Sequence, residues 1–436
     1  MKNGLMWQRL VWQTPLIMWG IIYAIIAVPM QDYLTLAGYS HSQLATVVLL
    51  VTLLLTWRLQ RWQSWPIDET LRARVLVVAA LCLASGFAPA GWRNGVDEIR
   101  RWGLALLIGY LVYVVPQRWQ DVAVLTVTLV LAPLAEALFA LLQSMRGIGP
   151  AAFHIAGTAY TRAFGTIGQP NSFAGYINGA WPLVLCLAVW AWQQRSRWRW
   201  LLLASVAMLG AALLLSFSRG GWIGAVVGLF VILWMVGGWW RRSVAVIVIV
   251  AVLVLAGGWQ YIPAPFGPRL GSATQIFSAP DITRDQAQQR PDIYAAVERA
   301  AQFNAGVAMW QSAPMLGVGP GNYTRVYPEF VRMGWLISRG HAHNAYVQIA
   351  AEQGIIGLCA YLGLWLLQWR RAWRATQLTG VGRWVAIAAC GTMAAVAAHE
   401  CFEYLQVNYL PLHTAAVAAL AGVAMRFAPT MREEQI

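Results

Sequence analysis

Long apolar stretches alternate with short polar connections over most of the chain. About twelve of these stretches approach the ~20 residues that an α-helix needs to cross a bilayer. We place them near residues 10–30, 42–57, 73–92, 102–116, 120–144, 172–193, 199–217, 220–238, 243–260, 343–368, 383–400 and 408–427. The pattern therefore predicts an all-α polytopic membrane protein with about twelve transmembrane helices.

One polar interval, residues 261–342, is much longer than the other connections. Its first part is rich in Pro, Gly, Gln and Asp, and we expect it to be irregular. Apolar residues then recur at helical spacing from Pro291, which is a residue type favoured in the first turn, and Pro314 ends the pattern. A second short helix is predicted from about Tyr323 to Met333.

The positions of the basic residues predict the orientation of the chain, because cytoplasmic loops carry an excess of Lys and Arg. Most basic residues fall on one side of the predicted helices. They are Lys2, Arg9, Arg58, Arg61, Arg72, Arg74, Arg118, Arg195, Arg197, Arg199, Arg241, Arg242, Arg370, Arg371, Arg374, Arg383, Arg426 and Arg432. We expect both termini to be cytoplasmic and residues 261–342 to be periplasmic. The first stretch lacks a small-residue cleavage site, so we expect it to remain as a span.

Four segments follow from this organisation. Residues 1–145 form N-terminal transmembrane helices, and residues 146–260 form a transmembrane core with arginine-bearing turns on the outer side. Residues 261–342 form the periplasmic loop domain, and residues 343–436 form C-terminal transmembrane helices.

Composition agrees with a membrane protein. The 436-residue chain is 59% hydrophobic and 11% charged, whereas a soluble chain carries about 25% charged residues. The net charge of +14 is spread over loops without a compact basic domain, so we expect no nucleic-acid partner. The five cysteines lie in or beside apolar stretches without metal-ligand spacing, and we interpret them as packing residues.

Two arginines on the outer side are candidates for binding an anion. Arg162 precedes one predicted span and Arg219 begins another, and glycines flank both. Arginine beside hydrocarbon is costly and usually has a partner or a function. A lipid-borne diphosphate fits such a pair, although either arginine alone could simply reach toward lipid headgroups. Arg299, Arg325 and Arg339 are weaker candidates, since each could be an ordinary solvated loop charge.

A histidine pair beside an asparagine follows the long loop, in His341-Ala342-His343-Asn344. Imidazole can accept a proton near neutral pH, so His343 is a candidate general base. Asn344 and Gln348 could orient a ring or sugar hydroxyls. His341 lies one step further into the loop and is the weaker candidate. The alternative for His343 is a packed residue at a membrane boundary.

Metal catalysis is not expected, because we find no Asp-x-Asp on the outer side, no His-Glu-x-x-His and no carboxylate cluster. Glu400 and Glu403 stand at the end of one predicted span, with His399 and His413 nearby. We interpret that group as structural or as a secondary polar patch. We expect neither a metal nor another cofactor.

These motifs resemble the signature of the O-antigen ligase family, which shares its core domain with O-antigen polymerases and bacterial protein O-oligosaccharyltransferases. The resemblance rests on four stretches and covers about residues 155–405. The stretches are His343-Asn344 followed after nine residues by Gly354-x-x-Gly357, Arg162-Ala163-Phe164-Gly165-Thr166 with Asn171, Ser218-Arg219-Gly220-Gly221, and Pro314-Met315-Leu316-Gly317-Val318-Gly319-Pro320-Gly321-Asn322.

The resemblance implies metal-independent, inverting transfer of a glycan from undecaprenyl diphosphate at the periplasmic side of the bacterial inner membrane. In ligases the acceptor is lipid A-core. By the same resemblance, His343 is the base that deprotonates the acceptor hydroxyl, and Arg162 and Arg219 hold the diphosphate. Arg299, Arg325, His341, Asn344 and Gln348 are possible supporting residues.

Three alternatives remain open at this point. A polymerase would extend a lipid-linked O-antigen or exopolysaccharide, and another lipid-linked glycan or surface polysaccharide would then be the acceptor. A protein O-oligosaccharyltransferase is less favoured, because those enzymes usually carry an extra C-terminal region and this sequence ends at Ile436 soon after the last predicted span. A polyprenyl-glycan transporter is also less favoured, since no paired broken repeats are evident.

Overall fold

The structure is a computed structural model, and it describes residues 16–30, 35–36, 38–60, 66–155, 157–238, 243, 246, 250, 258–271, 282–331 and 334–433. Helices dominate this part of the chain. They are α2 (Leu16–Ala27), α3 (His41–Gln60), α4 (Glu69–Gly86), α5 (Arg93–Val114), α6 (Trp119–Met145), α7 (Pro170–Gln193), α8 (Arg199–Leu215), α9 (Arg219–Val236), α11 (Phe266–Gly271), α12 (Arg284–Gln288), α13 (Pro291–Ser312), α14 (Tyr323–Phe330), α15 (Ala345–Ala375), α16 (Gly380–Glu400) and α17 (Pro411–Glu433). Short 3-10 turns, η1 (Ala151–Phe153) and η2 (Gly258–Tyr261), and an antiparallel hairpin of β1 (Thr35–Leu36) and β2 (Tyr39–Ser40) complete it.

The predicted helical membrane architecture is confirmed in its general form. Among the described residues, five helices are long and apolar enough to cross a membrane, namely α6, α7, α9, α15 and α16. Shorter apolar helices occupy Leu16–Ala27, Gln43–Arg58, Arg199–Leu215 and Pro411–Phe427. The stretch expected at 243–260 lies mostly outside the described residues, as does Met333, the expected end of α14.

One predicted boundary is wrong for a clear physical reason. The helix expected over residues 102–116 begins at Arg93 instead, so its first turns are polar. Arg100 pairs with Asp97 at 3.3 Å and Arg101 pairs with Glu98, both at a spacing of three residues along the helix. Such pairs lie on one helix face and support a helix without apolar residues.

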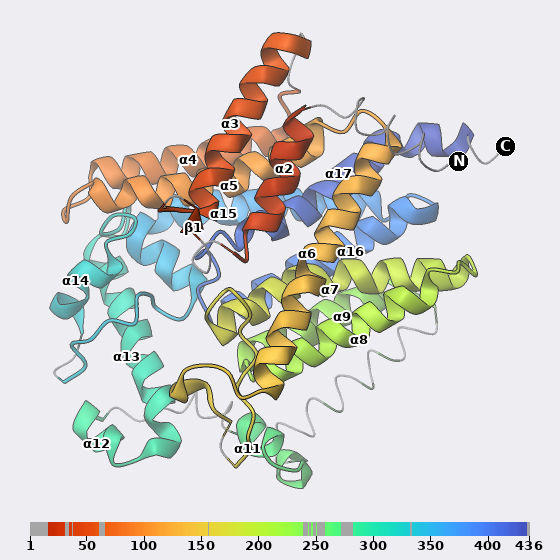
Figure 1. The fold of residues 1–436 in the computed structure, drawn as a ribbon. Helices are drawn as coiled ribbons and strands as arrows, with labels where there is room; N and C mark the ends of the chain where they lie inside the picture. The colour runs from red at the N-terminus through yellow and green to blue at the C-terminus, as the bar shows by residue number, and fades with distance from the viewer. Residues whose placement is uncertain are drawn as a thin grey trace.

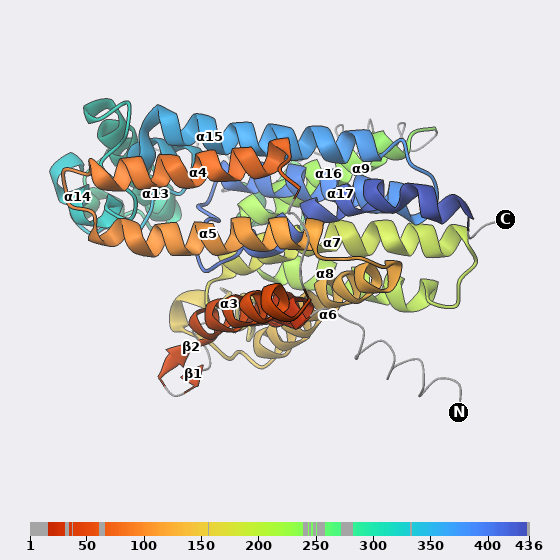
Figure 2. The ribbon, with the colours of Figure 1, turned by 90° about the horizontal axis from the view of Figure 1, so that it is seen from above.

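The helices α4, α5, α7, α8 and α9 run in roughly one direction, whereas α2, α3 and α6 cross them at a steep angle (Figure 1). The helices α13 and α14 gather at the end of the bundle where α15 begins (Figures 1 and 2). Near its centre, α16 packs against α7, α9 and α17. Towards the edges, α17 packs against α5, and α15 packs against α4. Because successive helices alternate in direction, the connections before α5, α7, α9 and α17 reach the same end as α13 and α14 (Figure 2).

The long loop is attached to the bundle by its own hydrophobic cluster. As predicted, α13 begins at Pro291, and it ends at Ser312. Met309 of α13 and Tyr323 and Tyr327 of α14 are buried together with Ala342 and Ala351, which flank the start of α15. The cluster therefore holds the loop against the helix that follows the two histidines.

The stretch expected over residues 343–368 is α15, which continues to Ala375 and is kinked at Gly354. Gly354 has a φ of 63°, a value that side chains disfavour. The kink exposes carbonyl groups, and Ala351 O and Glu352 O accept hydrogen bonds of 2.9 and 3.0 Å from Val318 N and Gly319 N. The glycine turn of the loop thus docks on the kink.

Candidate functional site

His343 lies at the junction of the loop and α15 in an unusual backbone conformation. Its φ of 52° is in the left-handed region, where strained residues often mark functional sites. Asn344 fixes the junction from the next position, because its side chain accepts from Val347 N at 2.9 Å as the N-cap of α15 and donates to Cys401 O at 3.0 Å. The conformation turns the ring of His343 toward Glu403, with Nδ1 3.0 Å from Oε1.

The contact with Glu403 fixes the tautomer of His343. A carboxylate can only accept, so Nδ1 donates to Oε1 and the proton of the neutral ring is on Nδ1. Nε2 is then left with a free lone pair. This is the arrangement that a general base needs, with one nitrogen held by a carboxylate and the other available for a proton.

His341 has both ring nitrogens occupied. Nε2 lies 3.2 Å from Glu403 Oε1, and Nδ1 accepts from the backbone N of His343 at 3.2 Å. Burial lowers the pKa of His341 to about 4, aided by the charges of His343 and Arg299 and opposed by Glu403. It is therefore neutral at physiological pH and holds the loop in place.

Glu403 joins the histidines to two residues from distant parts of the chain. Its Oε2 accepts from Asn171 Nδ2 at 2.6 Å and lies 3.6 Å from Arg299 Nη2. Burial opposes ionisation of Glu403, but its electrostatic interactions with His343 and His341, the hydrogen bond from His343 and the charge of Arg299 outweigh it, so its pKa falls well below the ordinary value. Glu403 is a buried, ionised carboxylate at physiological pH.

Arg162 connects to this group through Asn171. Its Nη2 donates to Asn171 Oδ1 at 3.0 Å and its Nε donates to Ser216 O at 2.8 Å. None of the described residues accepts from Nη1, which leaves one amino group for a ligand. Burial and then the charges of Arg269, Arg299 and Arg219 lower the pKa of Arg162 to about 9, while Glu403 opposes the shift. The guanidinium remains charged near neutral pH.

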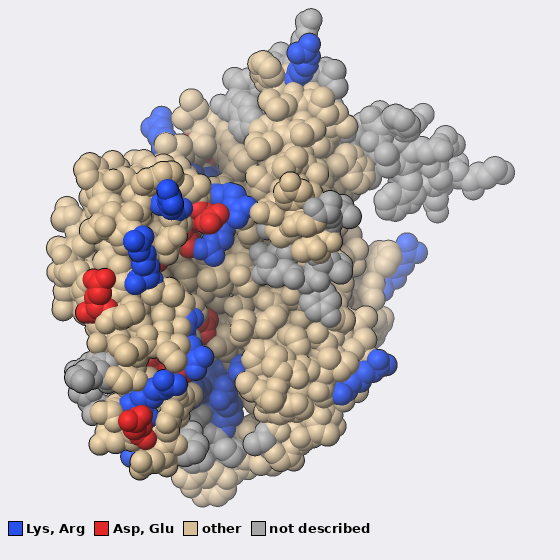
Figure 3. Space-filling view, turned by 60° about the vertical axis from the view of Figure 1, so that its left-hand side comes forward, with Lys and Arg blue, Asp and Glu red and all other residues tan. Residues whose placement is uncertain are grey.

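The tight turn between α8 and α9 brings more arginines to the same place. Phe217 has a φ of 51°, and its carbonyl accepts from Arg269 Nε at 3.1 Å and from Arg162 Nη2 at 3.5 Å. Arg219, the first residue of α9, is 7% exposed. In Figure 3, basic side chains gather around a hollow in the lower half of the face, beside the region of α13. Arg162, Arg219 and Arg269 therefore form an arginine cluster whose positive charge suits an anion.

The glycines beside these arginines have packing roles that differ from the expected ligand approach. A Cβ on Gly220 would lie 2.7 Å from His399, and one on Gly221 would lie 2.7 Å from Ala174, so both glycines let α9 begin close to its neighbours. A Cβ on Gly165 would lie 2.1 Å from Glu136 Oε2. Glu136 of α6 accepts from Thr166 N at 3.0 Å, which anchors the segment that carries Arg162.

The other sequence candidates have structural partners. Gln348 Oε1 accepts from Ala342 N at 2.8 Å, between the two histidines, so it supports their loop. Arg325 lies apart from the cluster and donates to Ala90 O. Arg339 pairs with Glu298 at 2.8 Å. Of Arg299, Arg325 and Arg339, Arg299 is therefore the one that contacts Glu403.

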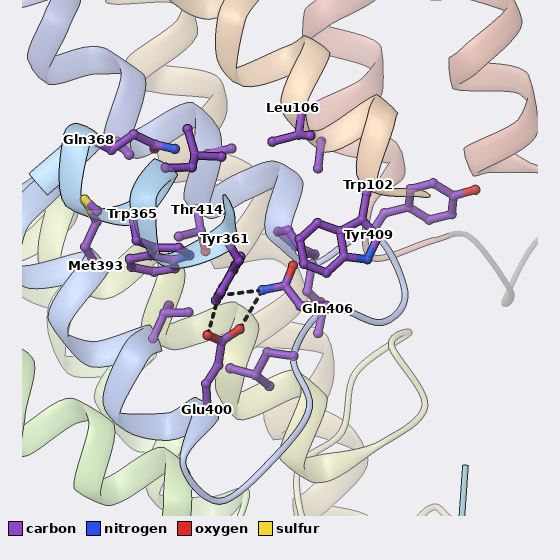
Figure 4. A pocket seen from close by; sticks show the side chains of 18 of the residues that line it. Trp102, Leu106, Tyr361, Trp365, Gln368, Met393, Glu400, Gln406, Tyr409 and Thr414 are labelled. Atoms are coloured by element: carbon purple, nitrogen blue, oxygen red, sulfur yellow. Dashed lines mark hydrogen bonds between the residues drawn. The ribbon is translucent and has the colours of Figure 1, made fainter. Parts of the chain in front are cut away.

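Glu400 is the last residue of α16 and lies three residues before Glu403, but it belongs to a different cavity. It accepts from Tyr361 Oη and Gln406 Nε2, each at 2.6 Å. Figure 4 shows this network at the base of a pocket whose walls include Trp102 and Trp365. The mainly apolar lining suits an apolar guest better than a sugar.

Three described residues have the geometry to hold a metal ion, namely His341, His343 and Glu403, whose ligand atoms lie within 4.8 Å of one another. The sequence did not suggest this group, because Glu403 is 60 residues from His343. The neighbouring Arg299 would repel a dication at Glu403. The same three residues already satisfy one another as a hydrogen-bonded histidine–carboxylate group.

Sequence reasoning missed two members of the site. The sequence pattern predicts Glu403 only as part of a structural group or a secondary polar patch, and it gives Arg269 no role. The sequence offered only a weak signal for each, a carboxylate just after an apolar stretch and an arginine in an irregular polar segment.

The fold and site define a helical membrane protein with a half-buried histidine that contacts a buried carboxylate beside an arginine cluster. Residues 203–362 match the family model described as O-antigen ligase, so this part of the chain is similar to that family. The match includes Arg219, Arg269, Arg299, His341 and His343. Members of the family are glycosyltransferase-like enzymes that act on lipid-linked glycans. The comparison with curated proteins finds no match.

Proposed function

We propose that this protein is an O-antigen ligase, which transfers a glycan from undecaprenyl diphosphate to lipid A-core without a metal and with inversion at the anomeric carbon. The observation that carries the proposal is the convergence on Glu403. His343 from the start of α15 and, through Asn171, Arg162 from the segment before α7 meet at this one carboxylate. A base and an anion-binding group are thereby linked in one site.

His343 acts as the base in this proposal. Nε2 takes the proton of the acceptor hydroxyl while Nδ1 donates to Glu403, which stabilises the imidazolium that forms. The acceptor oxygen bonds to the anomeric carbon as the bond from that carbon to the phosphate oxygen breaks. Attack from the face opposite the leaving group inverts the configuration. The proton ends on His343 and the negative charge on the diphosphate.

Arg162 and Arg219 hold the diphosphate, and Arg269 and Arg299 strengthen the local field. Diphosphate is a good leaving group, so the protein contributes mainly positioning and charge stabilisation. Arg162 Nη1 is the group best placed to contact the anion, since its other amino groups bind Ser216 O and Asn171. Arg299 is shared between Glu403 and the anion.

The orientation follows from the two ends of the bundle. The end with His343 faces the periplasm of the bacterial inner membrane, with residues 261–342 as a periplasmic loop domain. The other end, which carries the connections rich in arginine, faces the cytoplasm. We further propose about twelve spans, both termini inside, and the segments 1–145, 146–260 and 343–436 as the remaining parts.

An in vitro assay tests the function. Purified protein is mixed with an undecaprenyl-diphosphate glycan, with and without lipid A-core, in the presence of a chelator. Glycan on lipid A-core, formed only when lipid A-core is supplied, supports a metal-independent ligase. A lengthening lipid-linked ladder without lipid A-core would instead identify a polymerase, and loss of transfer on chelation would overturn the metal-free mechanism.

A further inference from the structure

A second charged cavity lies at the end of the bundle opposite to His343, where α4 begins and α15 and α17 approach their ends. Its lining combines five arginines with two carboxylates and a few apolar residues. The charged lining residues are Asp68, Glu69, Arg72, Arg370, Arg371, Arg374 and Arg426. No step of the proposed transfer uses this cavity.

Two of its arginines are held on one aromatic ring. The guanidinium carbons of Arg371 and Arg426 lie 4.6 and 5.9 Å from the centre of the Tyr113 ring. Arg426 also donates to Tyr113 O at 2.8 Å and to Val114 O at 3.1 Å. Gly422 permits the stack, because a Cβ there would lie 3.0 Å from both Arg371 Cδ and Tyr113 Cδ2. The cavity therefore has a fixed basic wall.

The carboxylate of Asp68 already has partners within the protein. Asp68 accepts from Arg371, and its other oxygen accepts from Leu71 N at 2.7 Å and from the Thr70 hydroxyl at 2.9 Å. Burial opposes ionisation of Asp68, but the hydrogen bond and charge of Arg371 and the bond from Leu71 lower its pKa. Asp68 thus balances Arg371, and both of its oxygens already accept hydrogen bonds.

Three arginines around the cavity have no partner anion among the residues that the structure describes. Arg370 and Arg374 are one turn apart on α15, so they project to the same side, and Arg72 extends from α4. All three are exposed, and no described residue forms an ion pair or hydrogen bond with their side chains. Glu69 is the one remaining carboxylate in the lining. The five arginines of the lining therefore outnumber its two carboxylates.

The apolar part of the lining favours an anion that is attached to a lipid. Ile67 and Met425 line the same cavity and are 72% and 41% exposed, and Leu367 completes this apolar edge. Arginine forks bind phosphate oxygens in pairs. Basic pockets between transmembrane helices on the cytoplasmic side bind the headgroups of anionic lipids. An acyl chain could follow the apolar edge while the phosphate enters the cavity.

We propose that the cavity between α4, α15 and α17 is a binding site for the phosphate headgroup of an anionic phospholipid, with Arg370 and Arg374 as the residues that contact the phosphate and the Arg371–Tyr113–Arg426 stack as its basic wall. This assignment does not depend on the proposed transferase activity.

The test uses full-length protein in nanodiscs of phosphatidylcholine with a small fraction of phosphatidylglycerol, and native mass spectrometry counts the retained lipids. The wild type is expected to retain phosphatidylglycerol selectively. An Arg370→Gln/Arg374→Gln variant loses two of the contacts, and its affinity should fall about thirtyfold. Arg195→Gln/Arg197→Gln, which removes the same charge from the α7–α8 connection outside the cavity, is the matched control and should retain phosphatidylglycerol as well as the wild type does.

Equal losses of affinity in both variants would show that general surface charge retains the lipid, and would contradict the assignment of this cavity as the binding site. Inorganic phosphate provides the second arm. If phosphate alone binds the wild type as well as the lipid does, the ligand is a soluble anion and the lipid assignment is wrong. A failure of glycan transfer in the same preparations would leave these outcomes unchanged.

Discussion

Glu403 determines how each neighbouring side chain can act. Its Oε1 is shared by His343 at 3.0 Å and His341 at 3.2 Å, yet the two rings differ in what remains free. His341 uses its second nitrogen on the backbone, whereas His343 keeps Nε2 for a substrate proton. The sequence could predict a histidine in this motif as the base, but not the carboxylate that orients it, because the two lie on different helices and meet only in the folded bundle.

Replacing Glu403 with Gln should reduce kcat on the order of a hundredfold, because the amide neither fixes the proton on Nδ1 nor stabilises the imidazolium. The KM for the lipid-linked donor should change little. Glu400→Gln is the matched control, since Glu400 is also a buried carboxylate but contacts Tyr361 and Gln406. Steady-state kinetics measure both. Equal loss of kcat in the two variants would contradict the assignment of Glu403 as the residue that orients His343.

The lowered pKa of His341 predicts that the stability of the protein depends on pH. Its pKa in the folded protein is about 4, against an ordinary 6.5, so between these values the unfolded chain binds a proton that the folded chain does not. Stability is therefore lost as pH falls from 6.5 to 4. His341→Gln removes the titrating group, and the fall in Tm between about pH 7 and about pH 5 should be smaller than in the wild type. An unchanged fall would contradict the assignment.

At the scale of elements, glycine places the loop domain against the membrane helices. The kink of α15 at Gly354 and the turn around Gly317 approach so closely that a Cβ on Gly354 would lie 2.2 Å from Met315 C. The helical periods of α13 and α15 were readable from the sequence, and the start of α13 at Pro291 is confirmed. The kink of α15 at Gly354 could not be predicted from the sequence, since it depends on the loop that docks against it.

Gly354→Ala should destabilise the protein by at least about 1–3 kcal/mol, the usual cost of a side chain in this backbone conformation, with the clash adding to it. The loop and the backbone at His343 should loosen together, so activity and Tm fall in parallel. Gly363→Ala, in the same helix with open space around the added Cβ, is the control and should be neutral or slightly stabilising. Thermal unfolding in detergent tests the pair, and a stable Gly354→Ala variant would refute the docking role.

At the scale of the whole molecule, the two ends of the bundle differ in chemistry. One end carries the loop domain, the histidines and the arginine cluster at Glu403, and the other carries the arginine-rich connections and the cavity lined by Arg370 and Arg374. The lengths of the apolar stretches predict the helices, and the excess of basic residues on one side predicts which end is cytoplasmic. The convergence of α7, α15 and the segment after α16 depends on packing between distant parts of the chain.

This orientation predicts a labelling pattern. A cysteine at Leu336, which is 61% exposed, should react with a membrane-impermeant thiol reagent in spheroplasts, while one at Gln377, in the connection between α15 and α16, should react only after permeabilisation. The unmodified protein, with its five native cysteines, gives the background. The reverse pattern would invert the proposed topology.

The most direct test of the account measures glycan transfer and donor binding by His343→Gln beside the wild type. Loss of the base should lower kcat between about 10²- and 10⁴-fold while binding of the polyprenyl-diphosphate donor persists, because the arginine cluster is separate from Nε2. His341→Gln, one step away in the same loop, should retain most of its rate. Transfer by His343→Gln at the wild-type rate would contradict the assignment of His343 as the base.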